Sequence, residues 1–175
     1  MKTNEITPDI VAKLRANLNE MNQLIFDFGM ASGLRISDII SITRDMLDIE
    51  KPTIREKKTG KPRRIYIPKK IRKELIKYHE AYGFNNYIFS SESKSGHVSR
   101  QAVFKAFKKA AEKAGIEGLN IAPHSMRKSY ACKLFDKGKD LDYIQDKLNH
   151  SHEGDTVIYV KGSLDKLMKM RRKRK

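Results

Sequence analysis

TIREKKTGKPRRIYIP, residues 53–68, is the stretch that decides the fold, because the hydrophobic period of the chain changes there. Two short runs, 53–55 and 64–67, read as β-strands on either side of a turn that contains Gly60 and Pro62. The segments before and after this stretch carry apolar residues at helical spacing. The pattern therefore predicts one small antiparallel sheet inside a mostly helical domain.

Helical spacing recurs along the rest of the chain. It predicts a helix over 8–31, which the glycines Gly29 and Gly33 weaken and end, and a short second helix over 36–43. Further helices are expected over 68–81, 99–114, 123–137 and 141–148, and a short one holds Tyr159. No internal repeat or low-complexity linker is visible. The predicted fold class is α+β: one domain over 1–162, followed by a basic tail over 163–175.

The charge balance separates this chain from an ordinary globular domain. Lys and Arg number 37 against 21 Asp and Glu, which gives a net charge of +16 and a pI of about 9.9. Such a surplus exceeds what solubility needs and predicts a polyanionic partner, nucleic acid before an anionic membrane. No stretch approaches the roughly 18 apolar residues of a membrane span.

The sequence also carries signs of its compartment. The N-terminal run MKTNEITPDI is polar and lacks the apolar core of a secretory signal. The single cysteine, Cys132, cannot form an internal disulfide and lies in the apolar run YACKLF, so a buried, inert thiol is expected. These features favour a reducing interior and predict a cytoplasmic protein.

Chemistry-bearing residues stand in four short contexts: SGLRISD, KKTGKPRR, PHSMRKS and LNHSHEGDTVIYV. The candidate catalytic residues in them are Arg35, Lys58, His124, Arg127, His150 and Tyr159. A phosphodiester resists attack because its anionic oxygens repel a nucleophile, and an arginine fork neutralises two such oxygens at once. Two arginines from distant segments, Arg35 and Arg127, suit this task, although each alone is also typical of a surface or buried charge.

The other four candidates supply proton transfer and a nucleophile. Lys58 in the exposed turn is placed to protonate the leaving oxygen, with Lys57 and Lys61 as rivals in the same turn. His124 and His150 can bind the phosphate or shuttle a proton, and His152 is an alternative of the same kind. The phenol of Tyr159, with an ordinary pKa near 10, needs cationic neighbours or a base to attack. A covalent phosphotyrosine would retain the bond energy and allow rejoining without ATP.

In this order, the four contexts resemble the tyrosine recombinase (phage integrase) family over about residues 7–160. The resemblance implies an integrase-like catalytic core that cuts and rejoins double-stranded DNA through a 3′-phosphotyrosine. It implies the six residues as the catalytic set, with Lys58 as the catalytic lysine and Asp38 as the acid that follows the first arginine. It also implies a homotetramer on DNA, and it is compatible with a monomer in isolation. It implies neither a metal nor a nucleotide cofactor.

The chain departs from the family pattern at three places. Asn149 stands where a glycine commonly precedes the histidine, and Lys128 replaces a histidine often found after the second arginine. The helical DNA-clamping domain that usually precedes the catalytic domain is missing from the 175 residues, so an excised domain or a minimal natural protein is expected. The tail, apolar at Leu164, Leu167 and Met168, is expected to dock on a neighbouring protomer or on its own domain.

Two other functions remain compatible with these patterns. A type IB topoisomerase shares the phosphotyrosine chemistry but relaxes DNA as a monomer. A non-catalytic DNA-binding protein of the same fold would explain the basic charge equally well, but it would have no need of the phenol.

Overall fold

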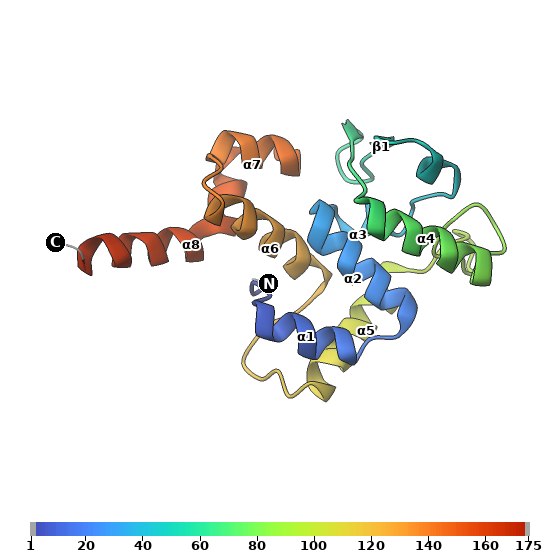
Figure 1. The fold of residues 1–175 in the computed structure, drawn as a ribbon, viewed down its shortest axis with the longest axis horizontal. Coiled ribbons are helices and arrows are strands. Elements are labelled where there is room, and N and C mark those ends of the chain that lie inside the picture. Colours follow the sequence, from blue (N-terminus) through green and yellow to red (C-terminus); the bar gives the residue numbers. More distant parts are fainter. Residues whose placement is uncertain (1–2, 174–175) are drawn as a thin grey trace.

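The computed structural model describes residues 3–173, with side chains described to residue 165 (Figure 1). Its helices are α1 (Pro8–Ala16), α2 (Glu20–Ser32), α3 (Ile36–Ile39), α4 (Lys69–Tyr82), α5 (Arg100–Lys113), α6 (Pro123–Asp136), α7 (Leu141–Leu148) and α8 (Glu153–Lys173). A 3-10 turn, η1 (Asp45–Asp48), precedes an antiparallel pair of strands, β1 (Thr53–Arg55) and β2 (Pro62–Arg64). The predicted α+β class, mostly helical with a small antiparallel sheet, is confirmed.

The predicted single helix over 8–31 is wrong, because the chain breaks between α1 and α2. Asn17 ends α1, and Asn19 begins α2 by accepting a hydrogen bond from the backbone N–H of Asn22 at 3.0 Å. Asparagine side chains bond to nearby backbone and so compete with a continuing helix. Leu18 between them is still buried, so the apolar spacing continues through the break.

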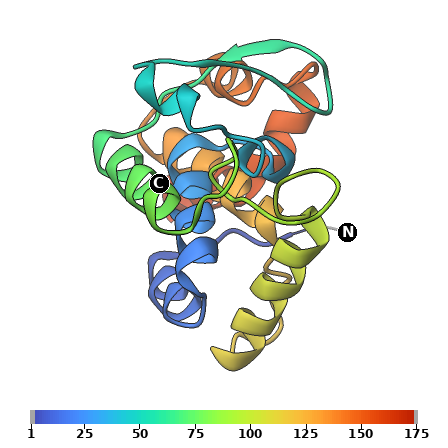
Figure 2. The ribbon, with the colours of Figure 1, turned by 90° about the vertical axis from the view of Figure 1, so that its right-hand side faces the viewer.

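Helix α2 forms the centre of the core, since it packs on α3, α4, α5 and α6 (Figure 1). Consecutive residues of α2 are buried, Leu24, Ile25 and Phe26 among them, as expected for a helix covered on all sides. Helix α1 lies beside α5 (Figure 2). Gly29 allows the close approach of α6, because a Cβ there would lie 2.5 Å from the sulfur of Met126.

The hairpin is shorter than predicted. Strand β2 ends at Arg64, where it pairs with Thr53, and the predicted strand over 64–67 is therefore wrong beyond its first residue. Pro52 precedes β1 and has no N–H to extend the ladder, although its carbonyl still accepts from Ile65 at 2.9 Å. Residues Ile65 and Ile67 instead bury their side chains in the core on the way to α4.

The C-terminal region forms one helix of 21 residues rather than a loop through Gly154, a short helix and a separate tail. Thr156, Val160 and Ser163 are buried at helical spacing, and α8 packs there against α6 and α7. Val160 joins Ala131, Ile144 and Leu148 in a second, smaller core, with Leu164 packed at its edge. Beyond it, α8 projects away from the body of the protein (Figure 1). Leu167 and Met168 lie outside the described side chains.

The structure also bears on the predicted buried cysteine and on the question of a membrane-spanning helix. Cys132 is fully buried and free, which confirms the predicted burial, and this burial raises its pKa to about 12. Within the described residues, no helix is long and apolar enough to span a bilayer.

Gly33 yields a prediction about stability. It ends α2 with φ of 62°, and a Cβ there would lie 2.3 Å from the ring of Tyr130. We expect Gly33→Ala to lower the free energy of unfolding by about 2–4 kcal/mol through backbone strain and overpacking. Gly60 has a similar φ of 67° but open space around it. Gly60→Ala is the control and should cost only ~1 kcal/mol in urea denaturation; equal losses would contradict the packing argument.

Candidate active site

The first arginine stands where the chain leaves α2. Gly33 turns the backbone in a left-handed conformation, and Arg35 occupies the N-cap position of α3. The Arg35 guanidinium donates to the carboxylate of Glu56, which is fully buried between the strands and the helices. The side chain of Arg35 is 15% exposed, so part of it remains accessible from outside.

Arg127 on α6 is the largest fully buried side chain, at 1% exposure. It donates to the carbonyl of Gly33 at 2.8 Å and to that of Leu148, which links the ends of α2 and α7. Its Nε has no partner within the described chain. Burial, with the charge of Arg35 next, lowers the pKa of Arg127 to about 10, so the group remains charged at neutral pH.

His150 lies just after α7. Asn149 ends that helix in the left-handed conformation, with φ of 51°, which Gly and Asn both tolerate; this explains how Asn149 can replace the usual glycine. The Nδ1 of His150 lies 3.0 Å from the hydroxyl of Thr156 on α8. Burial, together with the charge of Arg127, lowers the pKa of His150 to about 4.

Tyr159 lies between two histidines. Its hydroxyl hydrogen-bonds to Nε2 of His124, and its ring meets the rings of His124 and His150 edge-on, with centroids 5.3 and 5.1 Å away. Desolvation raises the pKa of Tyr159, and the charge of Arg127 opposes this rise. Desolvation also lowers the pKa of His124, as do the charges of Arg127, Arg35 and Lys58. The neutral pair therefore has the phenol donating to the imidazole.

Lys58 occupies the exposed tip of the hairpin, and its two neighbours are fixed. The N–H of Lys57 donates to Asp38 at 2.9 Å, and the hydroxyl of Thr59 donates to Glu56 at 3.0 Å. The turn is closed by the N–H of Glu56, which bonds the carbonyl of Lys61 at 3.0 Å. Lys58 lines a cavity of about 500 Å³ with residues that include Ser37, His97 and Arg100.

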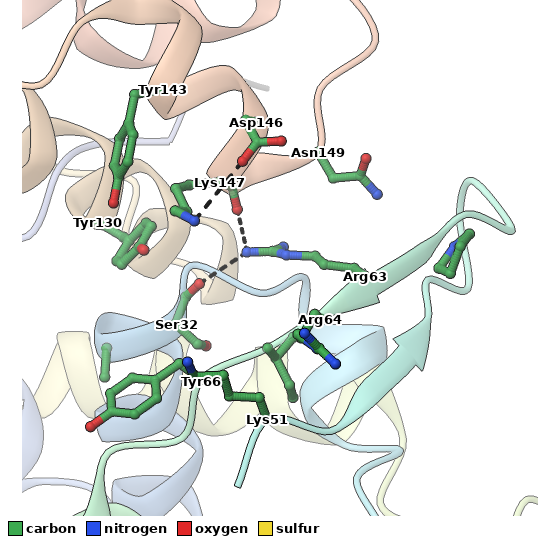
Figure 3. Close-up of a pocket in the computed structure, with 13 residues that line it drawn as sticks. Ser32, Lys51, Arg63, Arg64, Tyr66, Tyr130, Tyr143, Asp146, Lys147 and Asn149 are labelled. Atoms are coloured by element: carbon green, nitrogen blue, oxygen red, sulfur yellow. Dashed lines mark hydrogen bonds and ion pairs between the residues drawn. The ribbon is translucent and has the colours of Figure 1, made fainter.

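The structure brings five of the predicted site residues close together, from the start of α3, from α6, from the loop after α7 and from α8. Lys58, at the exposed tip of the hairpin, is connected to them through the effect of its charge on the pKa of His124. Sequence reasoning missed Glu56 and Arg63. Arg63 extends from β2 and donates to Glu56 at 3.3 Å. It also donates to the carbonyl of Ser32 at 3.2 Å and to that of Lys147 (Figure 3). One signal was available: Glu56 is the only acidic residue between Glu50 and Glu74, inside a strongly basic stretch.

The described residues include no group of three or more His, Cys, Asp or Glu side chains suited to a metal ion. The site instead gathers guanidinium, imidazole and ammonium groups around one phenol. This donor set is suited to an anionic, phosphate-bearing substrate.

A mostly helical α+β domain that gathers two arginines and two histidines around the phenol of one tyrosine fits the class of tyrosine recombinases. The sequence model of the phage integrase family matches residues 4–164, so the chain belongs to that family. It is 31% identical to the probable integrase/recombinase YoeC of Bacillus subtilis, over 82% of this chain and 79% of YoeC. The predicted tyrosine recombinase catalytic domain is confirmed.

Other relatives extend beyond the matched region. The chain is 31% identical to tyrosine recombinase XerA of Thermococcus kodakarensis, covering 82% of this chain but 52% of XerA. It thus spans about half of that relative. Among solved structures, a XerA recombinase superposes with a TM-score of 0.76 at 20% identity, over 97% of this chain and 64% of that one. A lambda integrase dimer bound to a core site gives 0.73 at 18% identity, over 91% and 60%.

The pKa of His150 predicts a pH dependence of stability. An unfolded histidine titrates near 6.5 and the folded one at about 4, so protons bind more tightly to the unfolded chain. The contribution of His150 to stability is therefore complete above about pH 6.5 and is lost as the pH falls toward 4. His150→Gln should lose less free energy of unfolding than the native chain between pH 7 and 4.5.

Denaturant titrations at both pH values check this expectation. His152→Gln, two positions further along at an exposed position, is the matched control for the loss of a histidine from this loop. An unchanged pH dependence in His150→Gln would contradict the prediction.

Proposed function

We propose that this chain cuts and rejoins double-stranded DNA by transesterification, with Tyr159 as the nucleophile. The observation that carries the proposal is the hydrogen bond from the Tyr159 hydroxyl to a neutral His124 beside the guanidinium groups of the site. A phenol that is merely packed needs neither an adjacent base nor surrounding cations. The family membership supports the same reaction.

In the proposed first step, the Tyr159 oxygen attacks the phosphorus and its proton passes to Nε2 of His124. Arg35 and Arg127 hold the non-bridging oxygens and stabilise the charge that develops on them. The bond from phosphorus to the 5′ oxygen breaks, and Lys58 donates a proton to that oxygen. The products are a 3′-phosphotyrosine and a free 5′ hydroxyl. Attack by another 5′ hydroxyl reverses these transfers and restores a phosphodiester.

DNA binding would itself prepare the base. The pKa of His124 is lowered by desolvation and by the surrounding cations. A phosphodiester placed among these cations would supply negative charge and raise that pKa, so His124 would accept the phenolic proton more readily. His150, whose ring orientation depends on Thr156, is assigned to hold a phosphate oxygen.

The proposed assembly on DNA is supported by the charge of the chain and by its similarity to known recombinases. The net charge of +16 favours DNA, and the solved neighbours include a XerH recombinase bound to its difH substrate. We propose a catalytic domain over residues 1–162 that acts as a homotetramer on DNA in the host cytoplasm. The tail over 163–175 would contact a neighbouring protomer, although α8 runs through this boundary without a break and Leu164 packs on its own domain.

A covalent trap tests the nucleophile. DNA duplexes with a nick and randomised arms release a short fragment after cleavage, which leaves the protein attached to the remaining strand. We expect the native chain to give a denaturation-resistant adduct whose DNA can be sequenced, and Tyr159→Phe to give none. Tyr143→Phe, an exposed tyrosine of α7, is the matched control and should keep the adduct.

The outcomes separate the alternatives. An adduct with Tyr159→Phe would show that the nucleophile is misassigned. No adduct from any variant, despite DNA binding, would favour the non-catalytic binder. Relaxation of supercoiled DNA by a monomer would favour a topoisomerase.

A second prediction concerns the general acid. Lys58→Ala should cleave ordinary DNA about 100-fold more slowly. It should regain most of its rate on DNA with a 5′-bridging sulfur, because a thiolate leaves without a proton. Lys57→Ala and Lys61→Ala are the matched controls from the same turn. If one of them, and not Lys58→Ala, loses its rate on ordinary DNA and regains it on the sulfur substrate, that lysine is the general acid.

A further inference from the structure

Arg63 is a charged side chain that the proposed chemistry does not use, yet its position is highly constrained. Its side chain is only 11% exposed, although it belongs to a strand at the surface. Burial lowers the pKa of Arg63, and the carboxylate of Glu56 opposes this effect. A buried guanidinium is costly unless each of its donors finds an acceptor, so this placement calls for a reason.

The contacts of Arg63 join three separate parts of the site. It bonds to Glu56 at the base of the hairpin turn. It also bonds to the carbonyl of Ser32 at the end of α2 and to the carbonyl of Lys147 at the end of α7 (Figure 3). The next residue, Arg64, is exposed and makes none of these contacts within the described chain.

The hairpin needs such an attachment, because its ladder is short. Each strand has only three residues, and a two-stranded hairpin of this size is marginally stable on its own. Lys58 lies at its tip, where a small tilt of the strands moves the side chain furthest. Glu56 bonds to Arg63 at one oxygen and to Thr59, the neighbour of Lys58, at the other. The chain of contacts thus runs from the helix ends through Arg63 and Glu56 to Thr59, the residue next to Lys58.

We propose that Arg63 is a positioning residue for proton donation: its bonds to Glu56, Ser32 and Lys147 hold the hairpin so that Lys58 reaches the leaving oxygen. This inference rests on the proposed function, specifically on Lys58 as the general acid. Arginine suits the task because its planar fork serves several acceptors at once, which the single ammonium of lysine does not.

The test compares two substrates. Both are nicked duplexes of one sequence recovered in the adduct selection, one with a normal bridging oxygen and one with a 5′-bridging sulfur. Arg63→Ala should cleave the normal substrate about 10- to 100-fold more slowly than the native chain, because a displacement near 1 Å is costly in an active site. On the sulfur substrate it should approach the native rate, since misplacing Lys58 no longer matters there.

A double variant provides the second readout. If Arg63 acts through Lys58, the double variant that combines Lys58→Ala and Arg63→Ala should cleave normal DNA as fast as the single variant Lys58→Ala. Arg64→Ala is the matched control; it removes the same charge from an exposed neighbour and should keep the native ratio between the substrates. Far-UV circular dichroism checks that each variant folds, and Arg63→Lys replaces Arg63→Ala if the latter does not.

The two failures are distinguishable. Lys58→Ala could regain its cleavage rate on the sulfur substrate while Arg63→Ala does not. This result would overturn the positioning role alone and leave Arg63 as a structural residue. If Lys58→Ala also fails to recover, the general acid is misassigned and the role of Arg63 falls with it. Additive losses in the double variant would likewise overturn the inference.

Discussion

The buried carboxylate of Glu56 is the contact on which the arrangement of the site depends. Burial alone would raise its pKa, but Arg35, Thr59 and Arg63 outweigh this effect and hold the pKa below its usual range. Removing one member of such a network would leave an uncompensated charge in the interior, which typically costs about 3–5 kcal/mol. Glu56 thereby fixes the hairpin turn and Arg35 against each other.

A second constraint concerns the ends of two helices. Helices α2 and α7 end in left-handed residues, Gly33 and Asn149, and their last carbonyls lack partners within the helix. Arg63 and Arg127 each donate to one carbonyl at the end of α2 and to one at the end of α7. Their positive charge is favourable there, because the C-terminal end of a helix dipole is negative. Arg127 is thus oriented by the fold before any substrate arrives, which spares it reorganisation during the reaction.

Desolvation is the main cause of the protonation state of the proton-transferring groups. Desolvation and neighbouring positive charge lower the pKa values of His124 and His150, so both rings are neutral at pH 7. The phenol of Tyr159 keeps its proton for a related reason, since desolvation raises its pKa. An anionic phosphodiester would relieve the repulsion among the cations, and we regard this electrostatic complementarity as the basis of substrate recognition.

The family, the mostly helical α+β class and the candidate catalytic residues could all be predicted from the sequence, because short motifs and apolar periods are local properties of the chain. It failed at the break between α1 and α2, at the length of β2 and at the unbroken course of α8, where capping and packing decide. Only the tertiary structure identified Glu56 and Arg63. Their contacts join residues that lie 21 positions apart, as for Arg35 and Glu56, or 84 apart, as for Arg63 and Lys147. No local pattern encodes such pairings, because they arise only when distant segments fold against one another.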